Sequence, residues 1–378
     1  MAVLTCTPAP SAQVEAEQLE HRWQQAPSLA ILRRAAELAR VLPFEQQQAW
    51  SGRARAAGLW HLCPLIATAQ DASLPPLERA RAAAAAWGTD RDCQARAVLR
   101  QLAPLLAPNE QAEVARLMSP EAADELSNLP RVWSVTPFFN ELEILEARLT
   151  EMARAVDVFV ILEAPRTFRG TPKPLYFADN RERFRRWAAQ IEHCVVDLPV
   201  SDDPWVPEHY QRDVAAGELA RLGARPSDLV LSTDLDEVVR ADKVPAVLEA
   251  TASSPVCLAM TMFWYSTEWS SRVYWAHPKG FRFGQVPTTS TYSDLRAFFS
   301  LPVVYDAGWH LSWFGGPERF DIKISSYAHA EADTPENHDR SYQERLMRDG
   351  IATTGEELLF RREHLPASMA CLFKAAAP

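Results

Sequence analysis

The sequence lacks the cysteine patterns that mark several classes of protein. Its six cysteines are scattered, and none stands in a C-x-x-C pair. This spacing argues against a zinc site and against a dense disulfide framework. We therefore expect reduced, partly buried thiols.

Long apolar runs are missing as well. No stretch approaches the ~20 apolar residues that a membrane-spanning helix needs, so we expect no membrane span. The first twenty residues, MAVLTCTPAPSAQVEAEQLE, have neither a basic start nor a continuous apolar core. We therefore expect no secretory signal and a cytoplasmic protein.

The sequence also lacks an excess of positive charge, since its formal net charge is -10. Non-specific binding to nucleic acid relies on a basic surface, so we expect no nucleic-acid partner. An anionic small substrate would need a metal ion or a local basic cluster.

The chain does have enough residues for two domains, at 378. Residues 1–129 are rich in alanine, leucine, arginine and glutamate and poor in glycine, which favours helices. In the segment from Ser28 to Pro43, for example, apolar residues recur on one helical face between a capping serine and a terminating proline. We predict an all-helical first domain. The spacing of its helix-sized segments is similar to that of stacked helical repeats, although no repeated signature is present.

Composition changes near Pro130, and from there strand-like and helix-like segments alternate. We predict strands at 132–138, 156–164, 193–199, 228–233 and 256–264. A helix at 141–153 links the first two strands, and this β-α-β order implies parallel strands joined by a right-handed crossover. The prediction for residues 130–378 is therefore an α/β domain with an open, mostly parallel sheet.

Three carboxylates stand at the end of one predicted strand, in the segment STDLDE. Ligands of open α/β sheets collect at the carboxyl ends of strands. Asp234 and Asp236 can reach a common point there, and crowded carboxylates are commonly held by a divalent cation. We predict that Mg or Mn binds here and bridges to a diphosphate. A solvated loop or a helix cap would show the same pattern, because D-x-D alone is a short motif.

Five segments from about Val132 to Gly350 resemble, in the same order, glycosyltransferase family 17: PFFNELEILEARLTEM, VDVFVILEAPRTFRGTPKPLYF, PWVPEHYQRD, SDLVLSTDLDEVV and AGWHLSWFGGPERFDIKISSYAHAE. The first domain has no counterpart in this resemblance. The resemblance implies a GT-A fold and inverting, metal-dependent transfer of N-acetylglucosamine from UDP-GlcNAc to a hydroxyl of a glycan or other acceptor. Asp234 and Asp236 match the acidic metal-binding motif of the family.

The resemblance also suggests a third metal ligand. His310, in GWHLSW, matches a histidine of the family pattern, and imidazole is a plausible ligand beside two carboxylates. The alternative is a hydrogen-bonded core histidine between Trp309 and Trp313.

Donor contacts are expected from strand ends and basic residues. Asn140 and Glu141 end the first strand and Glu163 ends the second, where the resemblance implies contacts with the uridine. Arg212 and Lys323 are candidates for the donor phosphates, because anionic oxygens bind fixed cationic donors, and Asp234 is shared between metal and donor. A helix cap, a solvated edge or a surface ion pair would equally place such residues here.

Inverting transfer needs a carboxylate that takes the proton of the acceptor hydroxyl, and the sequence does not fix which one. Glu208 and Glu268 rank ahead of Asp321. The aromatic run MFWYSTEW, followed by Tyr274 and Trp275, offers stacking faces for a sugar or ordinary core packing.

Two alternatives to a transferase remain open. A phosphatase of the haloacid dehalogenase type would use Asp234 as nucleophile and Asp236 as acid, although that motif normally opens its domain. A non-catalytic protein would use the helical domain as a binding module, and in a transferase the same domain would bind an acceptor or a protein partner.

Overall fold

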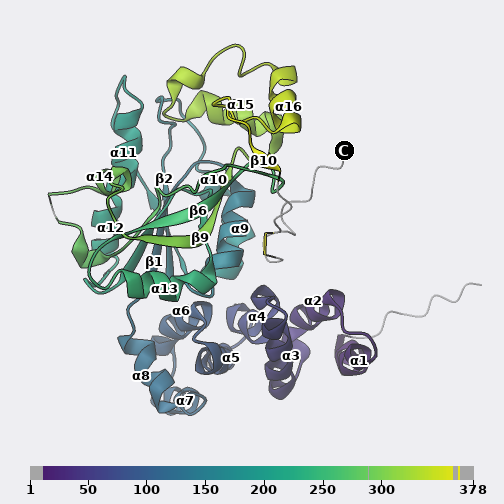
Figure 1. Cartoon of the computed structure of the whole chain (residues 1–378). Coiled ribbons are helices and arrows are strands. Elements are labelled where there is room, and N and C mark those ends of the chain that lie inside the picture. Colours follow the sequence, from purple (N-terminus) through teal and green to yellow (C-terminus); the bar gives the residue numbers. More distant parts are fainter. Residues whose placement is uncertain (1–11, 288, 361–364, 367–378) are drawn as a thin grey trace, which may run out of the picture. The chain divides into compact units, whose positions relative to one another are not determined.

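The computed structural model describes residues 12–287, 289–360 and 365–366 (Figure 1). The chain divides into two compact units, Met1–Asn128 and Leu129–Pro378. No helix within the described ranges has both the length and the hydropathy needed to cross a bilayer.

The described part of the first unit is entirely helical. Its α-helices are α1 (Ala12–Gln25), α2 (Leu29–Glu37), α3 (Phe44–Ala56), α4 (Pro64–Gln70), α5 (Pro76–Asp90), α6 (Cys93–Leu102), α7 (Pro108–Ala115) and α8 (Pro120–Asn128). One apolar cluster joins α1, α2 and α3 around Trp50. The alanine run of α5 is buried where that helix packs against its neighbours, and the Trp87 indole donates a hydrogen bond of 2.7 Å to the carbonyl of Ala122 in α8. Small alanine side chains let these helices approach closely.

The second unit contains a mixed sheet, which has ten strands among the described residues. The strands are β1 (Val132–Phe138), β2 (Val158–Glu163), β3 (Ile191–Val195), β4 (Leu229–Ser232), β5 (Glu237–Val239), β6 (Val256–Trp264), β7 (Trp269–Ser270), β8 (Lys279–Arg282), β9 (Val303–Ser312) and β10 (Leu359–Phe360). The parallel pairs are β1 with β2 and β4, β2 with β3, and β6 with β9. Strand β8 joins β4 and β6 through antiparallel pairs, and β5 pairs antiparallel with β9. All five predicted strands are confirmed, as β1, β2, β3, β4 and β6, and so is the α/β class.

Helices cover both faces of the central strands. The helices of this unit are α9 (Leu142–Met152), α10 (Tyr176–Asp179), α11 (Trp205–Asp213), α12 (Ala215–Arg221), α13 (Val244–Ala250), α14 (Tyr292–Ala297), α15 (Gly316–Ser326) and α16 (Arg340–Asp349). Figure 1 shows α9 on one side of β1 and β2 and α12 on the other. Leu145 of α9 packs in one apolar cluster with Ile161, while Leu219 of α12 packs in another with Val160. Burial on both faces explains why the strands read as continuous apolar runs.

Helices α15 and α16 form a third apolar cluster with the end of β6, centred on Phe320 and Leu346. Two successive glycines, Gly315 and Gly316, have φ values of +107° and +78° and turn the chain from β9 into α15. Glycine adopts such values without the steric cost of a side chain. This turn places the residues of α15 beside the carboxyl ends of the parallel strands.

Candidate active site

A cleft of about 530 Å³ opens at the carboxyl ends of β1, β2 and β4. Ligands of open α/β sheets bind at this edge, where loops and helix ends converge. The charged residues that line the cleft are Glu141, Arg166, Lys173, Glu208, Arg212, Asp234, Asp236, Arg296 and Lys323. Both aspartates of the D-x-D segment therefore face one cavity.

The loop that carries the aspartates rests on a buried guanidinium. Arg148 of α9 is fully buried, and its Nη1 donates to the carbonyl oxygens of Asp234 at 3.1 Å and Glu237 at 2.8 Å. Its Nη2 donates to the hydroxyls of Ser134 and Thr233 at 2.8 and 2.5 Å. Burial lowers the pKa of Arg148 to about 10, which leaves it charged at neutral pH. This one side chain fixes the backbone of the loop.

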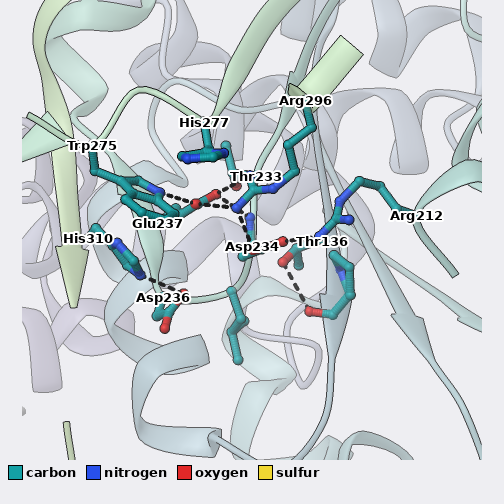
Figure 2. Close-up of polar contacts among 12 residues, drawn as sticks. Thr136, Arg212, Thr233, Asp234, Asp236, Glu237, Trp275, His277, Arg296 and His310 are labelled. Atoms are coloured by element: carbon teal, nitrogen blue, oxygen red, sulfur yellow. Dashed lines mark hydrogen bonds and ion pairs between the residues drawn. The ribbon is translucent and has the colours of Figure 1, made fainter. Parts of the chain in front are cut away.

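Glu237, the third carboxylate of the segment, is buried and organises the site from within. It accepts hydrogen bonds from the backbone N–H of Asp234 at 2.6 Å and from the Trp275 indole at 2.5 Å. Arg296 of α14 donates to both of its oxygens, at 2.7 and 3.1 Å (Figure 2). Glu237 therefore positions the first aspartate and Arg296.

Asp234 lies between two guanidinium groups. Its Oδ1 accepts from Arg212 at 2.7 Å and its Oδ2 accepts from Arg296 at 2.6 Å (Figure 2). Burial alone would raise the pKa of Asp234, but the charges of Arg296 and Arg212 outweigh burial and hold this pKa below its ordinary value. Both oxygens of Asp234 thus already have cationic partners.

Asp236 has a different environment, shared with Lys323 and His310. Lys323 Nζ donates to Asp236 Oδ2 at 3.0 Å, and His310 Nε2 lies 3.5 Å from Asp236 Oδ1. Burial acts against ionisation, but the charges of Lys323 and His310 keep the pKa of Asp236 well below its ordinary value. The carboxylate is therefore ionised at neutral pH, as a metal ligand must be.

Asp236 and His310 are close enough to each other to coordinate one divalent ion together. Their 3.5 Å separation is close to the roughly 3 Å between neighbouring ligands of one octahedral ion. The described residues, however, contain no group of three His, Cys, Asp or Glu side chains placed to hold a metal. The predicted set of Asp234, Asp236 and His310 is thus not assembled, because the guanidinium groups of Arg212 and Arg296 occupy both oxygens of Asp234.

The alternative expectation for His310, a hydrogen-bonded core histidine, agrees with its burial, since the residue is 7% exposed and lies beside Asp236. Its ring lies 4.7 Å from the Trp275 ring, which in turn stacks on His277 at 4.2 Å. Burial and the charge of Arg296 lower the pKa of His277 to about 4, so this imidazole is neutral in the cleft at neutral pH.

Basic side chains therefore balance the repulsion within the carboxylate cluster. The carboxylates of Glu208, Asp234, Asp236 and Glu237 contact the cations of Arg212, Arg296 and Lys323, and the buried Arg148 adds a positive charge behind the loop. The sequence attributed this balance to a metal ion. In the structure, cations from distant segments of the chain provide it.

Comparison with known protein families identifies the family to which this chain belongs. Residues 109–359 match the model of glycosyltransferase family 17. The chain belongs to this family. The match begins inside the helical unit and takes in α7 and α8, some twenty residues before the resemblance read from the sequence.

Two mammalian proteins are similar to this chain. The rat protein named beta-1,4-mannosyl-glycoprotein 4-beta-N-acetylglucosaminyltransferase is 23% identical in an alignment of 260 residues that covers 58% of this chain and 48% of the rat protein. The human protein of the same name is 23% identical in an alignment of 251 residues that covers 56% of this chain and 46% of the human protein. The chain spans about half the length of the curated relatives it matches.

In this family 17 chain, most of the residues predicted to contact the donor line the cleft or the small cavity beside it. Arg212, Lys323 and Glu141 line the cleft with the two aspartates. Asn140 borders a small adjoining cavity of about 20 Å³ that Glu141, Asp236 and Lys323 also line.

Glu163 is the exception among the predicted donor contacts. It is fully buried and does not line the cleft. Its carboxylate accepts from the backbone of Phe177 at 3.0 Å, lies 2.9 Å from His193 Nε2, and lies 3.7 Å from Lys173 Nζ. Both the predicted uridine contact and the alternative of a solvated edge are therefore wrong, because internal partners hold this carboxylate.

The three candidates for the general base differ in whether they line the cleft. Glu208 of α11 lines the cleft, and its Oε1 accepts from Arg212 at 2.9 Å. Glu268 is exposed in the turn between β6 and β7, outside the cleft lining. Asp321 accepts from Gln343 at 2.6 Å in the lobe formed by α15 and α16. Neither Glu268 nor Asp321 is among the residues that line the cleft.

Sequence reasoning missed Arg296, the cation that joins Asp234 to Glu237. It lies in YSDLRAFF, 62 positions after Asp234, and no spacing rule connects the two. The sequence suggests Trp275 as a stacking face for a sugar, and this residue does line the cleft. Its indole N–H also donates a hydrogen bond to Glu237, which the sequence does not reveal. Only the strand pairing of β6, β8 and β9 brings these residues together.

Proposed function

We propose that this chain is an inverting, metal-dependent glycosyltransferase of GT-A fold. It transfers N-acetylglucosamine from UDP-GlcNAc to a hydroxyl of a glycan or other acceptor. The observation that carries the proposal is that Asp234 and Asp236 face one cleft at the carboxyl ends of parallel strands. The rat and human relatives are named as N-acetylglucosaminyltransferases, which supports the choice of sugar.

Glu208 is the proposed general base. Arg212 holds its Oε1 at 2.9 Å, which orients the carboxylate and leaves Oε2 to take the proton of the acceptor hydroxyl. The acceptor oxygen then attacks the anomeric carbon from the face opposite the diphosphate. One C–O bond forms while the bond to UDP breaks, and the configuration at that carbon inverts.

Cationic side chains stabilise the departing diphosphate. Arg212 and Arg296 present guanidinium groups on either side of Asp234, and Lys323 presents an ammonium beside Asp236. Fixed cations aimed at a developing negative charge need no reorganisation during reaction. Guanidinium forks also match phosphate oxygens in geometry.

The charge balance of the cleft supports a metal requirement. Arg212, Arg296 and Lys323, the cations beside Asp234 and Asp236, are already paired with carboxylates, so a diphosphate bound there would add negative charge that these pairs do not compensate. Asp236 and His310 would hold Mn or Mg, and the bound ion would act as a Lewis acid toward the diphosphate.

Neither alternative fits as well. Three parallel strands precede β4, the strand that leads into Asp234, whereas the phosphatase motif normally opens its domain. Both oxygens of Asp234 are also bound by guanidinium groups, which is unsuited to a nucleophile that must attack freely. A purely non-catalytic binding module would not need a neutralised cluster of carboxylates in a cleft of this volume.

The direct test is release of UDP from UDP-GlcNAc, followed with and without Mn, together with a thermal-shift screen of sugar nucleotides. We expect Mn-dependent UDP release and a selective, Mn-dependent rise in melting temperature with UDP-GlcNAc. Absence of both responses would refute the proposal, and release of phosphate from a phosphomonoester would favour the phosphatase.

A further inference from the structure

One face of α11 runs along the cleft. Trp205, Glu208 and Arg212 stand at spacings of three and four residues, so they lie on the same side of the helix, and all three line the cleft. The side chain of Arg212 is 6% exposed and that of Glu208 is 15% exposed, while Trp205 at the start of the helix is half-buried. Along α11 the cleft thus changes from buried charge at Arg212 to an aromatic surface at Trp205.

Trp205 is part of an aromatic wall with residues that follow α15. The His329 ring packs edge-on against Trp205 with centroids 4.6 Å apart, and Tyr327 lies 5.4 Å from His329. All three line the cleft. We call these three residues the Trp205 wall. It combines apolar ring faces with an imidazole and a phenol that can hydrogen-bond.

A separate aromatic surface lies where the donor nucleoside is expected. Phe139, just after β1, packs edge-on against Tyr176 at 6.2 Å, and the Lys173 ammonium lies 5.4 and 5.3 Å from their ring centroids. This surface adjoins the carboxyl ends of β1 and β2, where nucleotides bind in open α/β sheets. This surface and the Trp205 wall consist of different residues, so a nucleoside on the first surface would leave the wall for a second ligand.

We propose that the Trp205 wall is the acceptor subsite and that it binds a pyranose ring of a carbohydrate. This assignment rests on the proposed function and names the residues of this chain that would bind the acceptor. A pyranose has an apolar C–H face that can stack on the indole and a rim of hydroxyls that can bond to His329 and Tyr327. A lipid chain would offer no hydrogen-bonding group to the phenol of Tyr327, the imidazole of His329 or the carboxylate of Glu208, all of which line this part of the cleft.

The position of the wall suits the transfer step. Residues three apart on a helix have Cβ atoms about 5–6 Å apart, so a ring stacked on Trp205 presents a hydroxyl within reach of Glu208. The proton of that hydroxyl passes to Glu208, its oxygen bonds to the anomeric carbon, and the electron pair of the broken bond leaves with UDP. Arg212, one turn further along α11, lies on the side of the departing diphosphate.

Saturation-transfer NMR on the full chain tests this subsite. The probes are methyl β-D-mannopyranoside and methyl β-D-N-acetylglucosaminide, added in the presence of UDP and Mn. The variants are Trp205→Ala, Trp205→Phe and Tyr210→Ala. Tyr210 is a matched control, because it is an aromatic residue of the same helix, is 45% exposed and does not line the cleft.

We expect the wild type, Trp205→Phe and Tyr210→Ala to transfer saturation to ring protons of at least one probe. Trp205→Ala should weaken that binding on the order of tenfold, the effect of losing one stacked aromatic contact. The dissociation constant of UDP should stay the same in all four proteins, and thermal melting would confirm that each is folded.

Two results would overturn the assignment. If Trp205→Ala weakens UDP and leaves the pyranosides unaffected, the wall binds the nucleoside. If the wild type binds UDP with Mn but neither pyranoside, the acceptor is not recognised here while the proposed function stands. Failure of the wild type to bind UDP at all would instead refute the proposed function, and this subsite with it.

Discussion

At the scale of single residues, the segment from Asp234 to Glu237 depends on contacts that neutralise and orient three neighbouring carboxylates. Arg148 fixes the backbone, Glu237 fixes Arg296, and Arg212 and Arg296 share Asp234. Each carboxylate therefore has a separate task despite the short spacing in the sequence. Predictions for single residues follow from these tasks.

The first prediction concerns Arg148. Arg148→Met should lower the free energy of unfolding by about 3 kcal/mol or more, because it leaves buried carbonyl and hydroxyl acceptors of the 232–237 loop without a donor. Urea unfolding would measure the loss. Arg185→Met is the control, since the Arg185 side chain is 79% exposed, and it should change stability by no more than about 0.5 kcal/mol. Equal stability of the two variants would contradict the role of Arg148.

The second prediction separates the two aspartates as metal ligands. Asp236→Asn should abolish calorimetrically detected Mn binding in the presence of UDP, whereas Asp234→Asn should reduce it less. The reason is that both oxygens of Asp234 are bound to arginine, while Asp236 Oδ1 faces His310 without a strong hydrogen bond. An equal loss in both variants would show that Asp234 leaves its arginines to bind the ion.

The sequence revealed the carboxylates of this site but not most of their partners. Asp234 and Asp236 stand out because they follow a strand within a short segment. Arg148 and Arg296 are 86 and 62 positions away from Asp234, so only the folded sheet shows that they converge. Glu163 was misassigned for the same reason, because its partners His193 and Lys173 come from β3 and from the loop that follows β2.

At the scale of elements, the site depends on the close pairing of β5 with β9. Glu237 of β5 lies opposite His310 of β9, and Gly308 lies opposite Val239. A Cβ on Gly308 would lie 2.1 Å from the carbonyl oxygen of Val238, so only glycine permits this approach. The pairing thus sets the distance between the D-x-D loop and His310.

The third prediction follows from this contact. Gly308→Ala should destabilise the protein by about 1–3 kcal/mol and weaken the Mn-dependent thermal shift, because overpacking pushes β9 and His310 away from Asp236. Gly217→Ala in α12 is the control. A Cβ there meets nothing within 4 Å, so this substitution should be neutral or slightly stabilising. A normal thermal shift in Gly308→Ala would contradict the argument.

The starts of β1 and β4 are joined by a buried carboxylate, and this gives a prediction for pH. Asp228 accepts from the backbone N–H groups of Arg131 and Arg225 at 2.9 and 3.0 Å and from the Trp133 indole at 3.0 Å. Burial opposes ionisation, but these hydrogen bonds outweigh it and hold the pKa of Asp228 below its ordinary value of 3.8. The pKa is therefore lower in the folded than in the unfolded chain. The resulting stabilisation is complete above pH 3.8 and is lost as the pH falls through the folded pKa.

The fourth prediction is that Asp228→Asn destabilises the protein most at neutral pH, and that its difference from the wild type shrinks as the pH falls below about 4. Urea unfolding of both proteins between pH 7 and pH 3 would measure this. A difference that does not change with pH would mean that the charge of Asp228 contributes nothing.

Elements were easier to predict than contacts. Strands β1, β2 and β4 are short apolar runs buried on both faces, and α9 carries Leu145 and Leu149 on its buried side, so local pattern was sufficient. The antiparallel pairing of β8 between β4 and β6 was not predictable, because strand order depends on contacts between segments that are distant in sequence.

At the scale of the whole molecule, each unit has a core of its own. In the first unit Trp50 and Leu32 belong to a cluster made only of residues before Pro64, and in the second unit Phe159 and Leu231 belong to a cluster made only of residues after Arg131. All residues that line the cleft lie between Pro137 and His329. Binding in the cleft is therefore an event of the second unit.

The fifth prediction follows from this division. Scanning calorimetry of the full chain should show two unfolding transitions, and UDP with Mn should raise the temperature of only one. At a ligand concentration 100 times the dissociation constant, the stabilisation of that unit should be about 2.7 kcal/mol. Asp236→Asn should keep both transitions and lose the ligand-dependent rise, because the variant lacks the proposed metal ligand but keeps both cores. If UDP with Mn raises both transitions together, the two units unfold as one cooperative body, and the helical unit then contributes to the stability of the donor site.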